Sequence, residues 1–201
     1  MPEAVIFDYG AGNLLSLRVA LEKAGLDVSI GSTGQEIKNA DAIALPGVGN
    51  FSAAAKKLDA VREEVHDAVA LGVPVLGICL GLQLFFTCSE EGQGKGLGLF
   101  GGKSVWLHTT VKVPHMGWNT LQIIKENALL ESVKDESYVY FVHSLYPMPE
   151  DKGLVVTQTD YGTTFASTIA NKNVFGTQFH PEKSGDVGLK ILKNFVRLVK
   201  K

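Results

Sequence analysis

Short apolar runs alternate with helical patterns through the first half of the chain. Four apolar runs, each bounded by turn residues, predict buried strands: Ala4–Phe7, Val28–Ile30, Ala42–Leu45 and Val75–Ile78. Helical spacing of apolar residues predicts the segments between and after them: Leu14–Ala24, Phe51–Leu58, Val61–Gly72 and Leu80–Phe86. Because strands that alternate with helices form a parallel sheet covered on both faces, this half predicts an α/β fold.

The second half is richer in strands. A glycine-marked loop spans residues 92–98, and a closing amphipathic helix carries Leu189, Leu192, Phe195, Val196 and Val199. Between them the pattern predicts six strands, several of them antiparallel: Lys103–Leu107, Leu121–Ile124, Tyr138–Val142, Leu154–Thr159, Thr164–Ala170 and Val174–Phe179. With no internal repeat or linker, we expect a single α/β domain over residues 1–201. Its open, mostly parallel sheet would be flanked by helices and carry additional antiparallel strands in the second half.

Composition and charge exclude several classes of protein. Lys and Arg total 19 against 21 Asp and Glu, so the net charge of −2 argues against a strongly basic nucleic-acid binder. The first residues lack the basic region of a signal peptide, and no run of about 18 apolar residues is present. Two cysteines make no disulfide framework, which favours a reducing compartment. We therefore expect a cytoplasmic protein that binds neither nucleic acid nor a membrane.

The run Gly77-Ile78-Cys79-Leu80-Gly81 joins a predicted strand to a predicted helix. This is the context of a nucleophile elbow, with cysteine in place of serine. The tight turn strains the backbone of the nucleophile, the two glycines allow neighbouring segments to approach, and a helix N-terminus favours a thiolate. The alternative interpretation is a buried cysteine beside glycines that pack a helix, and this pattern alone does not decide between the two.

The run His180-Pro181-Glu182 places an imidazole and a carboxylate on one side of an extended segment. Such a carboxylate fixes the tautomer of the histidine and stabilises the imidazolium. A surface turn with an ordinary His–Glu contact is the alternative, and it is the commoner one for this run alone. A cysteine nucleophile needs an oriented base, and both motifs follow strands, whose carboxyl ends share one edge of a parallel sheet. Together the two motifs therefore favour a catalytic site over the two alternatives. The sequence predicts a triad of Cys79, His180 and Glu182.

A third loop, Pro46-Gly47-Val48-Gly49-Asn50, also follows a predicted strand directly. Its glycines leave backbone N–H groups unshielded, and together with the N–H of Leu80 these groups are able to donate to a developing oxyanion. A plain turn with Asn50 as helix cap is the alternative, and both can hold at once.

Patterns for cofactors and metals do not match. The run from Gly10 to Leu15 begins like a dinucleotide fingerprint, but Leu15 stands where the third glycine belongs. The cysteines and histidines lack the spacing of zinc ligands. We therefore expect no cofactor and no metal. Cys88, which follows the elbow helix, is expected to be a core thiol.

These motifs, in this order and over essentially the whole chain, resemble the class I (triad) glutamine amidotransferases, which implies a flavodoxin-like α/β fold. Within them, three runs resemble the glutaminase subunits of imidazole glycerol phosphate synthases, which serve histidine biosynthesis. These runs are Asp8-Tyr9-Gly10-Ala11-Gly12-Asn13, Pro114-His115-Met116-Gly117-Trp118-Asn119 and Tyr140-Phe141-Val142-His143-Ser144.

The resemblance implies roles for single residues. Cys79 would attack the carboxamide of L-glutamine, His180 would move the proton, and Glu182 would orient His180. The N–H groups of Gly49 and Leu80 would hold the oxyanion. The substrate would contact Gln83 and the backbone near His143 and Ser144.

The resemblance also implies a partner. Ammonia would pass to a cyclase (β/α)8 barrel subunit in a heterodimer, which makes imidazole glycerol phosphate and an aminoimidazole carboxamide ribonucleotide. Asn13, Trp118, Tyr138 and Lys183 match positions that meet this partner. Core packing is the alternative for Trp118 and Tyr138, and a solvated charge is the alternative for Lys183. Because glycines make a peptide flip easy, we expect the loop Gly47–Asn50 to be poorly aimed until a loaded partner sets it.

Three other functions stay open at this point. The first is a glutaminase subunit that serves another acceptor, such as chorismate, and the Pro-His-Met-Gly-Trp-Asn run argues against it. A stand-alone γ-glutamyl cysteine hydrolase would be fully active without a partner. A non-catalytic regulatory module would usually have lost part of the triad, which is complete here.

Overall fold

A central mixed sheet organises the computed structural model, which describes residues 1–10 and 13–200. Within these residues the sheet has eight strands in the order β2-β1-β3-β4-β13-β12-β11-β8. Five strands are parallel: β2 (Asp27–Gly31), β1 (Glu3–Phe7), β3 (Ala42–Leu45), β4 (Val75–Ile78) and β13 (Val174–Thr177). The other three extend it antiparallel: β12 (Thr164–Asn171), β11 (Val155–Asp160) and β8 (Gln122–Ile123). The predicted fold class is confirmed.

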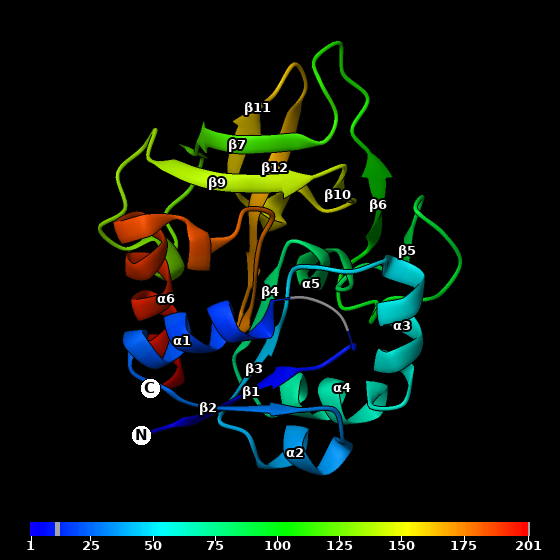
Figure 1. Ribbon diagram of the computed structural model, residues 1–201, viewed down its shortest axis with the longest axis vertical. Coiled ribbons are helices and arrows are strands. Elements are labelled where there is room, and N and C mark those ends of the chain that lie inside the picture. Colours follow the sequence, from blue (N-terminus) through cyan, green and yellow to red (C-terminus); the bar gives the residue numbers. More distant parts are fainter. Residues whose placement is uncertain (11–12, 201) are drawn as a thin grey trace.

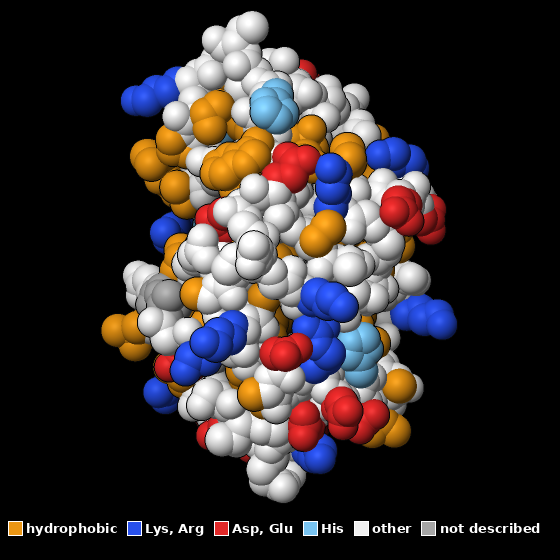
Figure 2. All heavy atoms as spheres, turned by 90° about the vertical axis from the view of Figure 1, so that its right-hand side faces the viewer, with side chains coloured by type: hydrophobic (Ala, Val, Ile, Leu, Met, Phe, Trp, Pro, Cys, Tyr) orange, Lys and Arg blue, Asp and Glu red, His pale blue; other side chains and the backbone are white. Residues whose placement is uncertain are grey.

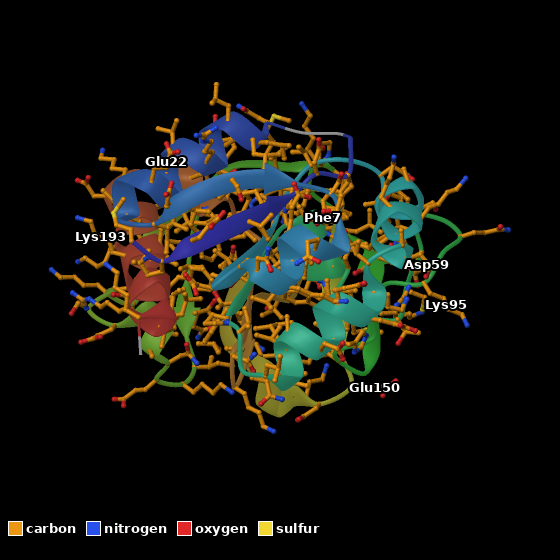
Figure 3. All side chains as sticks on the ribbon, turned by 90° about the horizontal axis from the view of Figure 1, so that it is seen from below. Phe7, Glu22, Asp59, Lys95, Glu150 and Lys193 are labelled. Atoms are coloured by element: carbon orange, nitrogen blue, oxygen red, sulfur yellow. The ribbon has the colours of Figure 1, made fainter. Side chains whose placement is uncertain are left out.

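Helices cover both faces of this sheet (Figure 1). On one face lie α1 (Leu14–Ala24) and α6 (Gly185–Val199); on the other lie α2 (Gly34–Asn39), α3 (Phe51–Asp59) and α4 (Arg62–Ala70). Two hydrophobic clusters therefore form, one on each side of the strands. Figure 3 shows Phe7 among the strands and charged side chains around the rim: Glu22, Asp59, Lys95, Glu150 and Lys193.

Local capping explains where the helices begin and end. The Asn13 side chain accepts a hydrogen bond from the Ser16 N–H, and α1 ends at Gly25 in the left-handed region with φ of +112°. Asn50 caps α3, as the sequence predicts. The short helix α2, which the apolar pattern missed, starts with a capping box between Thr33 and Glu36. The Ala11-Gly12 part of the first resembling run lies outside the described residues.

Two smaller sheets lie above the carboxyl ends of the parallel strands (Figure 1). One contains β10 (Leu145–Pro149), β6 (Gly102–Trp106) and β5 (Cys88–Ser89), and the other pairs β7 (His115–Thr120) with β9 (Tyr138–His143). Three short 3-10 turns complete the described structure: Ala128–Leu130, Lys152–Leu154 and Pro181–Lys183. Strands β5, β7 and β10 were not predicted: β5 has only two residues, β10 contains two prolines, and β7 carries exposed hydrophobic residues on its outer face.

Two expectations about the segment after the elbow are wrong. The helix α5 spans only Leu80–Gln83, because the carbonyls of Leu84 and Phe85 instead accept hydrogen bonds from the N–H groups of Leu97 and Phe100. The glycine-rich loop thus ends the helix. Cys88 is exposed rather than a core thiol, because the chain leaves the interior at Thr87 and enters the short strand β5.

The close packing at the elbow predicts a specific cost of adding one methyl group. A Cβ on Gly81 would press against the backbone carbonyl of Leu45, and we expect Gly81→Ala to lower the free energy of unfolding by about 2 kcal/mol or more. Gly101→Ala is the control, because its Cβ would meet only the flexible end of the Glu150 side chain. Urea unfolding measures both variants. A loss well below this value in Gly81→Ala would show that the elbow has room for a side chain.

Candidate active site

Three loops that carry candidate chemistry follow three adjacent strands. Strand β4 pairs in parallel with β3 on one side and with β13 on the other. In this register Gly77 lies opposite Leu45 and Ile78 lies opposite Thr177, so the three strands end side by side. The loop after β3, Cys79 after β4 and His180 after β13 therefore meet at one edge of the sheet.

Cys79 sits on a strained turn between β4 and α5. Its φ is +48° and its ψ is −100°, values that are costly for a residue with a side chain. Glycines make the turn possible: a Cβ on Gly77 would lie 2.7 Å from the backbone of Gly81. The N–H of Cys79 donates to the carbonyl of Thr177 at 2.7 Å, which ties the turn to β13. The strand–turn–helix geometry predicted for the elbow is present.

His180 and Glu182 form a buried pair beside the thiol. The Nδ1 of His180 lies 2.7 Å from Oε1 of Glu182, and the two side chains are only 1% and 7% exposed. Burial alone would lower the pKa of His180, but hydrogen bonds and charges from Cys79 and Glu182 raise the pKa to about 10. Because Glu182 occupies Nδ1, the nitrogen that serves the thiol is Nε2. The arrangement is that of an activated nucleophile with an oriented base.

The loop after β3 closes over the imidazole. A Cβ on Gly47 would lie 2.7 Å from Cε1 of His180, so only glycine lets this backbone cover the ring. Gly49 has φ of +139°, in the region that favours glycine, and Asn50 then starts α3. The loop thus places its backbone beside the pocket of Cys79 and also caps α3 with Asn50, so the two expected roles are compatible.

A pocket of about 350 Å³ opens beside the thiol. Predicted site residues in its walls are Gly49, Cys79, Leu80, Gln83, His143 and Ser144. Sequence reasoning missed Glu91, a half-buried wall residue whose Oε2 accepts the N–H of Phe51 at 2.6 Å. Its place in a glycine-rich loop gave no periodic signal. A larger hollow of about 580 Å³ near residues 123–133 is lined by no cysteine, histidine or aromatic side chain, so size alone does not locate the site.

Gln83 faces this pocket with a fixed orientation. Its Nε2 donates to the carbonyl of Leu145 at 3.0 Å and to Oε1 of Gln178 at 3.2 Å. Both N–H groups of the amide are therefore used inside the protein, and Oε1 is the group left to meet a ligand.

Comparisons with known proteins identify the family of this chain. Residues 5–199 match the family described as "Glutamine amidotransferase class-I". The chain belongs to the class-I glutamine amidotransferase family. It is 50% identical to "Imidazole glycerol phosphate synthase subunit HisH" of Halobacterium salinarum, over 96% of this chain and 91% of that protein. The HisH protein of Methanocaldococcus jannaschii is 48% identical, over 96% and 98% of the two chains.

Solved structures agree on the fold. The "Structure of PurLQS from Thermotoga maritima" superposes with a TM-score of 0.79 at 19% identity, covering 98% of each chain. At that identity the likeness concerns the fold alone.

Two further histidines of this amidotransferase are buried and neutral. His143 and His115 lie opposite each other on β9 and β7, with His143 Nε2 and His115 Nδ1 3.0 Å apart. Burial lowers the pKa of His143 to about 3 and that of His115 to about 4. The His143 imidazole also donates to the carbonyl of Leu145. The ring of His143 is thus engaged inside the protein, while its residue borders the pocket beside Ser144.

Trp118 and Tyr138, two of the residues predicted to meet a partner, lie on the outer face of the β7–β9 sheet. Trp118 is 56% and Tyr138 62% exposed, so the core-packing alternative is wrong for both. Lys183 Nζ lies 6.0 Å from the ring centre of Tyr140, on the same face. Asn13 is exposed and caps α1. In Figure 2 hydrophobic side chains gather over the upper part of the molecule, the part that holds the two small sheets in Figure 1.

Metal and membrane signals are both missing from the described part of the chain. No group of three or more His, Cys, Asp and Glu side chains among residues 1–10 and 13–200 is placed to hold a metal ion. None of the helices described is long and apolar enough to cross a membrane.

Acid is expected to destabilise the protein through the neutral histidine pair. The folded pKa values of about 3 and 4 lie below the value of about 6.5 for an unfolded histidine. Below pH 6.5 the unfolded chain therefore binds protons that the folded chain does not, and the free energy of unfolding falls with the pH. In His115→Phe, which keeps the ring stacked between Phe141 and Tyr161, the loss between pH 7 and 4.5 should shrink by about 2 kcal/mol.

Urea unfolding at both pH values measures this difference, with His66→Gln as the control because His66 is exposed. An unchanged pH dependence in His115→Phe would mean that the pKa of His115 is not lowered by folding.

Proposed function

We propose that this chain is the glutaminase subunit of an imidazole glycerol phosphate synthase, with residues 1–201 acting as one glutaminase domain. It hydrolyses L-glutamine to glutamate and ammonia for histidine biosynthesis. The observation that carries the proposal is the elbow cysteine beside the buried His180–Glu182 pair, in a chain half identical to HisH proteins.

The nucleophile in this proposal is the sulfur of Cys79. His180 takes the thiol proton on Nε2, and the thiolate attacks the carboxamide carbon of glutamine. The imidazolium, stabilised by Glu182, then gives that proton to the departing nitrogen, so ammonia leaves and a thioester forms. The raised pKa of His180, about 10, favours holding the proton until the leaving group needs it. Water, with His180 as base, cleaves the thioester and releases glutamate.

The oxyanion of this reaction would be held by backbone donors. The N–H of Leu80 begins α5 next to the sulfur, and Gly49 supplies a second N–H from the loop that covers His180. We keep the proposal that a loaded partner aims this second donor, since a glycine at φ of +139° can change its peptide orientation without a side chain to obstruct it.

Two side chains fit the remaining groups of glutamine. The free Oε1 of Gln83 is an acceptor for a substrate N–H group. The Glu91 carboxylate carries a negative charge in the pocket wall and suits the α-ammonium, while its Oε2 stays anchored to the N–H of Phe51. The backbone at His143 and Ser144 borders the same space.

The partner in this proposal is a cyclase (β/α)8 barrel subunit that consumes the ammonia in a heterodimer. Trp118 and Tyr138 give the outer β7–β9 face the exposed aromatic side chains that protein interfaces favour. Lys183, which follows Glu182 directly, and Asn13 would join this interface. The cytoplasmic setting and the lack of a cofactor stay predictions.

The test of the function is glutamate release in three states: the chain alone, with a cyclase barrel subunit, and with that subunit plus its ribonucleotide ligand. We expect a low rate alone and a large rise only in the loaded complex. A high rate alone that the barrel does not change would point to a free hydrolase or to another acceptor.

Removal of the nucleophile should separate catalysis from assembly. We expect Cys79→Ala to abolish glutamate release in the loaded complex and to leave partner binding, measured by calorimetry, within about threefold of wild type. Cys88→Ala is the matched control and should keep full activity, because Cys88 lies on the exposed strand β5. Glutamate release by the Cys79 variant would refute the assignment.

Loss of the negative charge on Glu182 should slow the reaction without emptying the site. Glu182→Gln keeps a polar group beside Nδ1 of His180 but no longer stabilises the imidazolium, so kcat should fall about a hundredfold or more. Steady-state kinetics of the loaded complex measure it, with the exposed Glu63→Gln as control. A kcat within threefold of wild type would show that His180 needs no carboxylate.

A further inference from the structure

A second set of contacts reaches the sulfur of Cys79, independent of the triad. Nε2 of Gln178 donates to the sulfur at 3.3 Å. On another side the carbonyl of Val142 lies 3.7 Å from the same sulfur and accepts from the thiol. An amide donor favours the thiolate, whereas a carbonyl acceptor favours the thiol. His180 on the triad side also favours the thiolate, and the Gln178 amide adds a second favourable contact as long as its N–H points at the sulfur.

Gln178 is held by a continuous series of hydrogen bonds. Its Oε1 accepts from Gln83, whose second N–H is bound to the carbonyl of Leu145. The same carbonyl accepts from Nδ1 of His143 at 2.8 Å. Because that nitrogen must donate, Nε2 of His143 is the acceptor for His115 at 3.0 Å.

The series ends on strand β7. With Nδ1 of His115 donating, its Nε2 is the acceptor that faces the amide of Asn119 at 3.4 Å, and that amide also donates to the carbonyl of Asp160 at 2.8 Å. Every donor in the series thus has an acceptor when both histidines are neutral, which agrees with their lowered pKa values. A flipped amide or a protonated ring would leave a buried group unpaired.

Burial fixes the orientation of these amides and rings, because no water can replace a hydrogen bond that is lost. Gln178 is 0% exposed, and Gln83, His143 and His115 are all buried. None of these contacts is needed by the triad itself, since Glu182 orients His180 directly. On β7 the inward His115 alternates with the outward Met116 and Trp118, so the series joins the sulfur to the strand with the exposed aromatic face.

We propose that Gln178 positions the sulfur of Cys79 and favours its thiolate, and that the neutral pair His115–His143 holds Gln178 in the orientation that does so. The proposal deepens the proposed function, because it rests on Cys79 as the nucleophile. It concerns the free chain, however, and is tested without glutamine or a partner. Its failure is therefore distinguishable from a failure of the glutaminase assignment.

The test is the rate of alkylation by iodoacetamide between pH 5 and 10, followed by mass spectrometry of the full chain. All variants carry Cys88→Ser, because the exposed Cys88 would otherwise react. In Gln178→Leu we expect the midpoint of the rate–pH curve to move up by about one pH unit and the rate at pH 7 to fall about tenfold. In the isosteric Gln178→Glu, which places a charge beside the sulfur, the shift should be larger.

The matched control is Gln158→Leu on β11, a half-buried glutamine that lies opposite Ala166 and Gln122. It should keep the wild-type curve. Thermal unfolding shows whether each variant is folded, and Gln178→Glu serves if Gln178→Leu is not. A midpoint within 0.2 pH units of wild type in a folded Gln178 variant would overturn the proposal.

A double-mutant cycle tests the far end of the series. If His115 acts on the sulfur only through Gln178, His115→Phe should slow alkylation at pH 7 about threefold in the parent chain and not at all in Gln178→Leu. Equal slowing in both backgrounds, or no slowing in the parent, would overturn the part assigned to the histidines.

Discussion

The parallel pairing of β4 with β13 is the constraint on which the site depends. Cys79 and His180 are about a hundred residues apart in the sequence, and only this pairing brings their strands to a common edge. The hydrogen bond from the Cys79 N–H to Thr177 continues the pairing into the elbow itself. A slip of one residue would turn alternate side chains to the opposite face and remove the base from the nucleophile. The hydrophobic clusters on both faces fix this register, and so they hold Cys79 and His180 together as well as stabilising the fold.

Three buried histidines, His115, His143 and His180, show how neighbouring groups set the charge of an imidazole. Burial lowers the pKa of each, yet His180 ends with a raised value and His115 and His143 with lowered values. The difference is the neighbouring group: a carboxylate and a cysteine beside His180, but a carbonyl and a second imidazole for the other two. The site thus keeps one histidine ready to hold a proton and two that must not take one. Both states require the low-dielectric surroundings that the packed strands provide.

The elements that local pattern controls were predictable, and those that depend on distant contacts were not. The parallel strands and the helices α1, α3 and α6 follow apolar periods and caps, so the fold and the triad loops could be placed from sequence. By contrast, α5 ends early because the carbonyls of Leu84 and Phe85 accept hydrogen bonds from the loop near Leu97. Cys88 is exposed because the chain leaves the interior just before it. Glu91 and Gln178 join the site through tertiary contacts, with no spacing of their own. The resemblance to known amidotransferases supplied the substrate and the partner, which no pattern of apolar residues contains.

The β7–β9 sheet holds the His180 segment through its backbone and exposes aromatic residues on its outer face. Its backbone anchors the base, because the carbonyl of Tyr140 accepts the N–H of His180, and Ser184 bridges the same two segments. Its inward side chains include the histidine pair. A partner bound to the outer face would therefore press on strands that already contact the catalytic loop at several points. The two strands are paired over six residues, from His115 with His143 to Thr120 with Tyr138. In the proposed complex, the sheet that would meet the partner is also the sheet whose backbone holds the His180 segment, so linking the two requires no change in the main sheet.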